Sequence, residues 1–169
     1  MWRAAGGAGV PELDRGALGL ARRHPVLEHD LVSAVVRVFC LGETVAVRLF
    51  SNLRRGATVP VARRALDRVL RDEVRHSDFG WTALEWLLER PDADELRSVV
   101  AGGLPGWIAD LERSYGDDLD RGVASVTAEE RAWGLAPWSE YRSILHRAYE
   151  RDYRRRFARL GIEFEAGSR

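Results

Sequence analysis

Two long stretches of helical periodicity, joined by a short stop-and-start signal, constrain the fold of this chain more than any other feature. Between residues 26 and 54, apolar side chains recur every three or four positions, which predicts one face of an α-helix. A second stretch with the same spacing covers residues 60 to 90. Between them, Gly56 suits a helix C-terminus, Thr58 an N-cap and Pro60 a first-turn position. The sequence therefore predicts a long antiparallel helix hairpin.

Each predicted apolar face also carries polar side chains that could bind a ligand. The first face is expected to consist of Leu31, Ala34, Val35, Val38, Phe39, Val45, Ala46 and Leu49. Glu43 falls within this face, and Glu73 and His76 fall within the second. A carboxylate on a buried face is costly unless it is paired or bound to something. These three residues are therefore the candidates for a functional site.

Helix geometry predicts that the three side chains lie level with one another. If the first helix ends near Arg55 and the second begins near Pro60, Glu43 lies twelve residues before the turn and Glu73 thirteen after it. At ~1.5 Å rise per residue, both are roughly 18–20 Å from the turn. His76 follows Glu73 by three residues and so lies on the same face of its helix.

Two interpretations of this cluster remain open from the sequence. Carboxylate and imidazole ligands together suit iron, manganese or zinc better than magnesium or calcium. Alternatively, Glu73 and His76 form a polar pair that is satisfied by Arg75 or Arg48.

Other titratable residues point less clearly to a site. Cys40 is one helical turn from Glu43, but a lone cysteine on an apolar face is expected to be a small buried hydrophobe. His146 and Glu150, four residues apart in the last predicted helix, are expected to have a solvated or structural role. The sequence contains no glycine-rich phosphate loop and no nucleophile elbow, so nucleotide-dependent and hydrolytic chemistries have nothing to rest on.

Composition favours one helical domain. The 169 residues suit a single domain, and 46% apolar and 31% charged residues are ordinary for a globular protein. We expect residues 1–25 to be a weakly structured arm, 26–161 an all-α domain and 162–169 a tail. The C-terminal part is expected to contain a helix from Asp92 that is broken at 102–106, and a last helix from Pro137 to about residue 160.

Charge and cysteine content bound the setting of the protein. The formal net charge is zero, so bulk electrostatics predict no nucleic-acid partner. The single cysteine excludes an internal disulfide and fits a reducing compartment, and no apolar run is long enough for a membrane span. A cytoplasmic protein is expected.

The hairpin motifs resemble those of the ferritin-like superfamily. The resemblance is carried by Glu43 after a glycine and by the Asp72-Glu73-x-Arg75-His76 sequence, and it covers about residues 28–90. It implies a ferritin-like helical bundle in which Glu43, Glu73 and His76 bind iron in a di-iron carboxylate site. Asp72 and Arg75 would orient these ligands. The implied activity is that of a ferroxidase or of an enzyme that activates dioxygen. In the second case the enzyme would act on an organic substrate, which the sequence does not identify.

The chain departs from this family in having one ligand set where two are usual. In one resolution, a homodimer completes the site, as in encapsulated ferritins, whose subunit is similar to this hairpin. In the other, the chain is a degenerate relative that holds one metal or none and acts as a non-enzymatic interaction scaffold. The sequence leaves both open.

Overall fold

The computed structural model describes residues 24–116 and 125–164, and the regular elements within these ranges are all helical. The all-α class expected from the sequence is therefore confirmed. The elements are α1 (Leu27–Ala34), η2 (Val35–Glu43), α2 (Thr44–Gly56), α3 (Pro60–Leu87), α4 (Ala93–Gly116), α5 (Ala128–Ala132), α6 (Trp138–Ala148), η3 (Tyr149–Tyr153) and α7 (Arg154–Arg159). Most of the predicted arm 1–25 and tail 162–169 lies outside the described residues.

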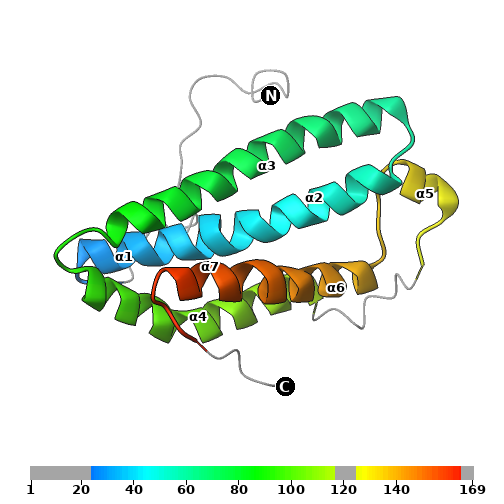
Figure 1. Ribbon diagram of the computed structural model, residues 1–169. Coiled ribbons are helices and arrows are strands. Elements are labelled where there is room, and N and C mark those ends of the chain that lie inside the picture. The colour runs from blue at the N-terminus through cyan, green and yellow to red at the C-terminus, as the bar shows by residue number, and fades with distance from the viewer. Residues whose placement is uncertain (1–23, 117–124, 165–169) are drawn as a thin grey trace, which may run out of the picture.

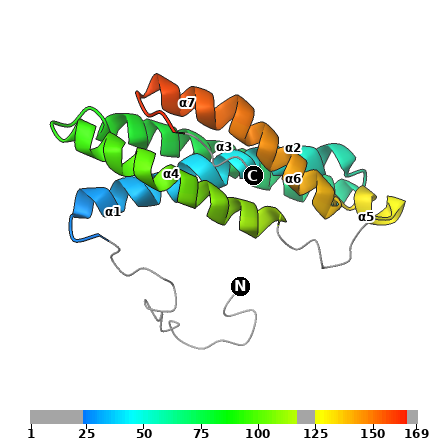
Figure 2. The ribbon, with the colours of Figure 1, turned by 90° about the horizontal axis from the view of Figure 1, so that it is seen from below.

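Apart from the short α5, the helices of the described residues form four long rods, whose arrangement is seen in Figure 1. The first consists of α1, η2 and α2 without interruption, and α3 returns beside it to complete the predicted hairpin. The third is α4, which packs on α1 and η2, and the fourth consists of α6, η3 and α7, which packs on α2 and α4. Figure 2, seen from below, shows α4 between α1 and the last rod. The first rod is therefore central and contacts all the others.

The hydrophobic core lies between the first rod and its three neighbours. Its fully buried side chains are large and apolar, each worth about 1.5–3 kcal/mol when removed from water. They come from every rod and include Val36, Leu41, Val45, Leu84, Leu96, Val100, Leu104, Tyr153 and Phe157. Among the described residues, no helix combines the length and the apolar character that a membrane crossing needs.

The first rod contains a π-helical stretch that the sequence did not predict. The buried pair Val35 and Val36 is followed five residues later by the buried pair Cys40 and Leu41. This wider turn shifts the apolar face by one residue, because a π turn holds more residues than an α turn. Leu31 and Val38, expected in the core, are instead 45% and 51% exposed, and Ala34 is exposed as well. The prediction was wrong for these three because it assumed an unbroken α-helical period.

The break predicted in α4 was also wrong, since the helix continues through Pro105. The stripe Leu96, Val100, Leu104 and Ile108 is buried at regular four-residue spacing and holds both halves in one line. Pro105 lies on the exposed side, where water can hydrate the carbonyl that the proline leaves without a donor. Packing therefore outweighs the local cost of the proline.

The hairpin turn follows the prediction with one shift. α2 ends at Gly56 and α3 begins at Pro60, as expected. The N-cap residue is Val59 and not Thr58, and no side chain caps this end. Instead, the backbone N–H groups of Thr58 and Val59 donate to the carbonyl of Ala132 in α5, at 2.8 and 3.0 Å. The short helix α5 therefore closes the open end of the hairpin.

Candidate metal centre

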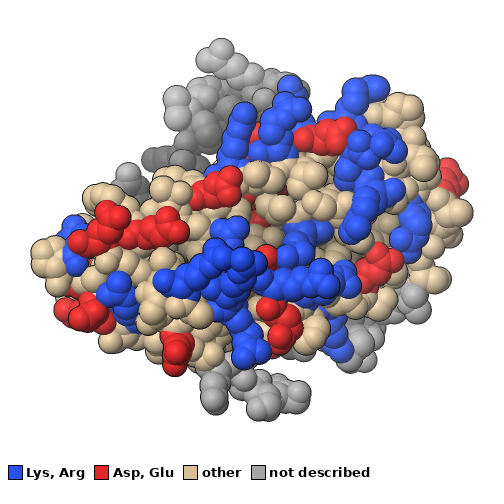
Figure 3. All heavy atoms as spheres, viewed as in Figure 1, with Lys and Arg blue, Asp and Glu red and all other residues tan. Residues whose placement is uncertain are grey.

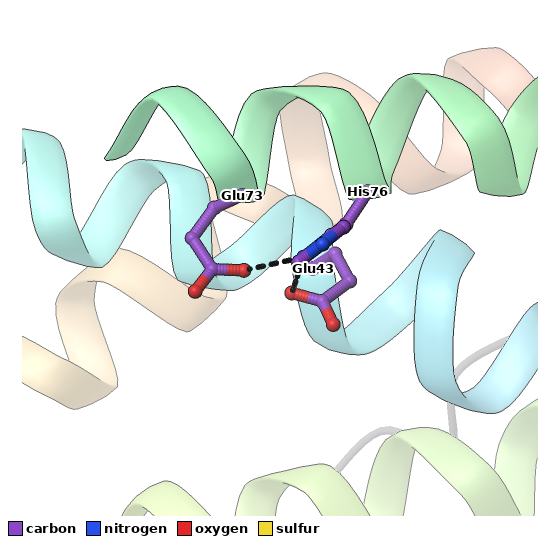
Figure 4. A group of neighbouring side chains, drawn as sticks. All are labelled: Glu43, Glu73 and His76. Carbon is purple, nitrogen blue, oxygen red and sulfur yellow. Dashed lines mark hydrogen bonds and ion pairs between the residues drawn. The ribbon is translucent and has the colours of Figure 1, made fainter. Parts of the chain in front are cut away.

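Three side chains from the middle of the hairpin point to a common region of space (Figure 4). Glu43 ends η2, and Glu73 and His76 lie on consecutive turns of α3. His76 Nδ1 is 3.3 Å from a Glu73 oxygen and 3.9 Å from a Glu43 oxygen, and one ligand atom from each residue lies within 4.8 Å of the others. Ligand atoms ~2.0–2.2 Å from one ion lie roughly 3–4 Å apart. The spacing is therefore close to that of an ion-binding site.

A glycine sets the close approach of the two helices beside this cluster. A Cβ atom at position 80 would lie 2.4 Å from the Cβ atom of Phe39, closer than real Cβ contacts allow. Phe39 precedes Glu43 by one turn, and Gly80 follows His76 by one turn. The Phe39 ring packs edge-on against Phe79, with ring centroids 5.1 Å apart. Gly80 therefore determines how near Glu43 can come to the ligands of α3.

A buried hydrogen-bonded trio fixes the hairpin from its other side. The Trp81 indole N–H donates to Thr44 Oγ1 at 3.0 Å, and the hydroxyls of Thr44 and Ser77 lie 2.9 Å apart. Thr44 directly follows Glu43, and Ser77 directly follows His76. We call Thr44, Ser77 and Trp81 the polar clamp. Because the clamp residues adjoin the ligands in sequence, they hold the ligand backbones at a fixed separation.

The electrostatic environment of the cluster favours a cation. Burial raises the pKa of Glu43 from 4.5 to about 7, with further contributions from a hydrogen bond with Glu73 and from repulsion by its charge. The nearby His76 opposes this rise. The raised pKa means that Glu43 holds a proton more readily than an ordinary carboxylate, and a bound cation would displace that proton.

The arginines that could have satisfied the cluster are engaged elsewhere. Arg48 pairs with Asp152, and Arg75 pairs with Asp72 at 3.5 Å on the exposed side of α3. In the described part of the chain, His76 is the only basic side chain that pairs with either carboxylate. The interpretation as an arginine-satisfied polar pair therefore has no support from the geometry. Asp72 and Arg75, expected to orient the ligands, pair with each other at 3.5 Å.

The remaining sequence candidates lie away from this centre. Cys40 is fully buried in the core, and burial raises the pKa of its thiol. His146 is exposed, and Glu150 pairs with Arg154 at 3.5 Å. Over residues 24–116 and 125–164, the Glu43, Glu73 and His76 group is the one set of three or more such ligands close enough to share an ion.

The cluster opens to the surface and is flanked by exposed apolar side chains. The His76 side chain is 51% exposed, and Phe79, one turn further along α3, is 57% exposed. Val38 precedes Glu43 by five residues, which is close to one π-helical turn, and is also exposed. In Figure 4, the last rod lies behind the hairpin, and the three ligands lie in front of it. Further exposed apolar residues continue along the hairpin away from the cluster, at Leu27 and Leu31 in α1 and at Trp86 near the end of α3. We call Leu27, Leu31, Val38, Phe79 and Trp86 together the apolar rim.

No family model, curated protein or solved structure is significantly similar to this chain. The ferritin-like resemblance therefore rests on Glu43, on the Asp72–His76 motif and on the all-helical hairpin that carries them.

Sequence reasoning missed two features that position the ligands, although each had a signal. The five-residue step from Val36 to Leu41 is the signature of the π turn, and it was hidden by Val35, Phe39 and Cys40, which keep the whole region apolar. The polar clamp had a weaker signal, since Ser77 and Trp81 are four residues apart on one side of α3. Nothing in the sequence pairs them with Thr44 until the hairpin register is known.

Proposed function

We propose that this chain is a ferritin-like metal-binding protein that binds iron through Glu43, Glu73 and His76 and oxidises it with dioxygen. One observation carries the proposal: two carboxylates and an imidazole converge at an open surface, and neither carboxylate has an arginine partner in the described residues. Such a cluster costs stability when empty and gains it when a cation binds. Two carboxylates and one imidazole suit iron best, with manganese or zinc as alternatives.

A second copy of the chain is proposed to complete the site. One chain supplies three ligands, and the His76 side chain among them is 51% exposed. The apolar rim, which includes Val38 and Phe79 near these ligands, would be buried in a symmetric contact, in which the same patch faces itself across a two-fold axis. That contact would bring four carboxylates together, which repel one another unless cations lie between them. Dimer formation and iron binding are therefore coupled in this proposal.

Each ligand has a distinct role in the proposed site. Glu73 would hold iron through the carboxylate oxygen that lies 3.3 Å from His76 Nδ1. Glu43 would bind one ion and release its proton on binding, because its raised pKa keeps it partly protonated beforehand. His76 would bind through Nδ1, the ring nitrogen that faces both carboxylates. Iron(II) supplies the electrons that reduce dioxygen, and the residues hold the charges of the oxidised ions.

Iron itself is the proposed substrate, in preference to an organic molecule. The cavity between α2, α3 and α6 is lined by Thr44 and Ser77, on the far side of the hairpin from the ligands. An organic substrate in that cavity would be separated from the ions by the helix backbones. A ferroxidase needs only an open route for iron, and the exposed His76 provides one.

Metal analysis tests the proposal directly. Protein purified after growth in iron is compared with Glu43→Ala, Glu73→Ala and a matched control, Glu85→Ala, which removes an exposed carboxylate elsewhere on α3. We expect iron in the wild type and in the control, and at least a tenfold loss in the two ligand variants. Equal iron content in all four proteins would show that Glu43 and Glu73 do not bind iron.

Light scattering with and without a chelator separates iron oxidation from a scaffold role. A dimer that dissociates when iron is removed, together with iron-dependent dioxygen consumption, supports the proposed function. A metal-free protein that stays monomeric in added iron would instead support the non-enzymatic scaffold. In that case the apolar rim would be the surface for a different partner.

A further inference from the structure

A second cluster of charged side chains lies on the opposite side of the hairpin from the carboxylates. There, α2, α3 and the last rod line an open cavity of about 360 Å³. Its charged lining consists of Arg48, Arg55, Arg147, Arg156, Asp78 and Asp152. Four guanidinium groups against two carboxylates leave an excess of positive charge. Figure 3 shows basic side chains gathered in a band across this face of the molecule, over the last rod.

Two of these arginines are held in place while keeping donors free. The Arg156 guanidinium lies 4.9 Å from the centre of the Trp81 ring, a cation–π contact that uses its flat face and not its N–H edges. Arg48 donates its Nε–H to Asp152, which leaves its terminal N–H groups for another acceptor. Groups that are already ordered lose less entropy when they bind a ligand.

The wall of the cavity also offers hydroxyl groups. Thr44 and Ser77 of the polar clamp both line it, and so does Ser51. In the clamp, the Trp81 N–H donates to Thr44, and one of the two hydroxyls donates to the other. Whichever hydroxyl does so, the pair has one more O–H to donate. The cavity therefore combines guanidinium and hydroxyl donors, the set that recognises an oxyanion.

We propose that this cavity binds the phosphate group of a small organic phosphate ester. Arginines placed around a concave site match the several oxygens of a phosphate, and the two excess positive charges match its charge near neutral pH. The cavity is much larger than a phosphate ion needs, and Val47, Val74 and Ile144 give it an apolar wall. The phosphate would face the arginines, and the organic part would lie against this wall.

Titration calorimetry with inorganic phosphate and phenyl phosphate tests this site on metal-free protein at low ionic strength. We expect both to bind, and phenyl phosphate to bind about tenfold more tightly because its ring covers the apolar wall. Equal affinities for inorganic phosphate and phenyl phosphate would support a phosphate site but would overturn the proposal that the ligand is an organic ester. No binding of either compound would overturn the site.

Two arginine variants provide the matched comparison. Arg147→Gln removes an exposed arginine that lines the cavity, and Arg154→Gln removes one that pairs with Glu150 outside it. We expect about tenfold weaker phosphate binding in the first variant and less than a twofold change in the second. Equal losses in both would show binding to bulk positive charge and would overturn the proposal.

The Glu73→Ala variant separates this site from the proposed iron site. Phosphate also binds metal ions, so residual iron could imitate an anion site. If the cavity binds phosphate, Glu73→Ala leaves the affinity unchanged even where it abolishes iron binding. Loss of phosphate binding in this variant would place the anion at the metal and overturn the cavity site. The result is independent of whether iron is oxidised.

Discussion

The two sides of the hairpin are built from adjacent residues but have opposite energetics. On one side, Thr44, Ser77 and Trp81 are buried, hydrogen-bonded to one another and covered by the last rod. On the other side, Glu43 and His76, their immediate neighbours in sequence, lie at an open surface. The first side stabilises the fold, and the second repels itself when no cation is bound. The closed side therefore fixes the backbone from which Glu43 and His76 project.

The largest effect is expected from removing the centre of the closed side. Trp81→Ala deletes a buried indole that packs on Phe157 with ring centroids 5.0 Å apart, and it also leaves the Thr44 hydroxyl without its donor. We expect the free energy of unfolding to fall by about 3–5 kcal/mol, measured by urea denaturation. The control Trp133→Ala removes an exposed tryptophan and is expected to change stability by less than ~0.5 kcal/mol. Similar losses in the two variants would mean that the closed side does not anchor the hairpin.

A smaller effect is expected where the two sides meet, at Gly80. Gly80→Ala places a methyl group against Phe39 and forces η2 and α3 apart, at a cost of about 1–3 kcal/mol. Because Glu43 moves with Phe39, iron affinity is expected to fall as well. Denaturation and metal titration measure the two losses separately.

Gly102→Ala provides the matched control for this substitution. A Cβ atom at Gly102 meets no atom within 4 Å, and the residue lies inside α4. Alanine is the better helix former, so this variant is expected to gain up to ~1 kcal/mol. If both alanine variants gained stability, the close approach at Gly80 would not be needed to place the ligands.

The open side is expected to contribute a pH dependence of opposite sign to that of ordinary surface carboxylates. Because the pKa of Glu43 is raised to about 7, the folded metal-free protein binds a proton more tightly than the unfolded chain. The Glu43 contribution to stability is therefore full below pH ~4.5 and is lost as the pH rises toward 7. Partial exposure screens this cost, so we expect a loss of about 1 kcal/mol.

Glu43→Gln isolates this contribution. In metal-free protein at pH 8, the variant is expected to be more stable than the wild type by about 1 kcal/mol, because it removes the repulsion with Glu73. The control Glu85→Gln is expected to leave the pH profile unchanged. A Glu43→Gln variant that is less stable at pH 8 would show that the carboxylate serves the fold and not a ligand.

The sequence predicted the hairpin because the signals for it are local. Gly56 and Pro60 mark the turn, and the three- and four-residue spacing on either side of it needs no tertiary information. The convergence of Glu43, Glu73 and His76 followed from counting the residues between each of them and the turn. The all-α class and these residue positions were therefore within reach of the sequence alone.

The features that sequence reasoning missed depend on packing between distant elements. Pro105 is tolerated because the buried stripe of α4 continues past it, and the π turn is stabilised where the Tyr153 hydroxyl donates to the Leu41 carbonyl at 2.7 Å. Likewise, α5 caps α3 through the Ala132 carbonyl, more than seventy residues after the turn. Each contact joins residues whose proximity is set only by the finished fold.

The smallest effect on folding is expected from a substitution in the apolar rim. Such a substitution tests dimer formation without changing the stability of the monomer. Val38→Ser removes an exposed methyl pair beside the ligands and is expected to change monomer stability by less than ~0.5 kcal/mol. If two copies meet through this rim, the same change weakens the iron-dependent dimer, measured by sedimentation at several concentrations. The control Val61→Ser alters a similarly exposed valine in the first turn of α3, far from the ligands, and should leave the dimer intact. Equal dimer affinities in both variants would remove the rim from the interface, whereas a selective loss in Val38→Ser would show that the open side is completed by a second chain.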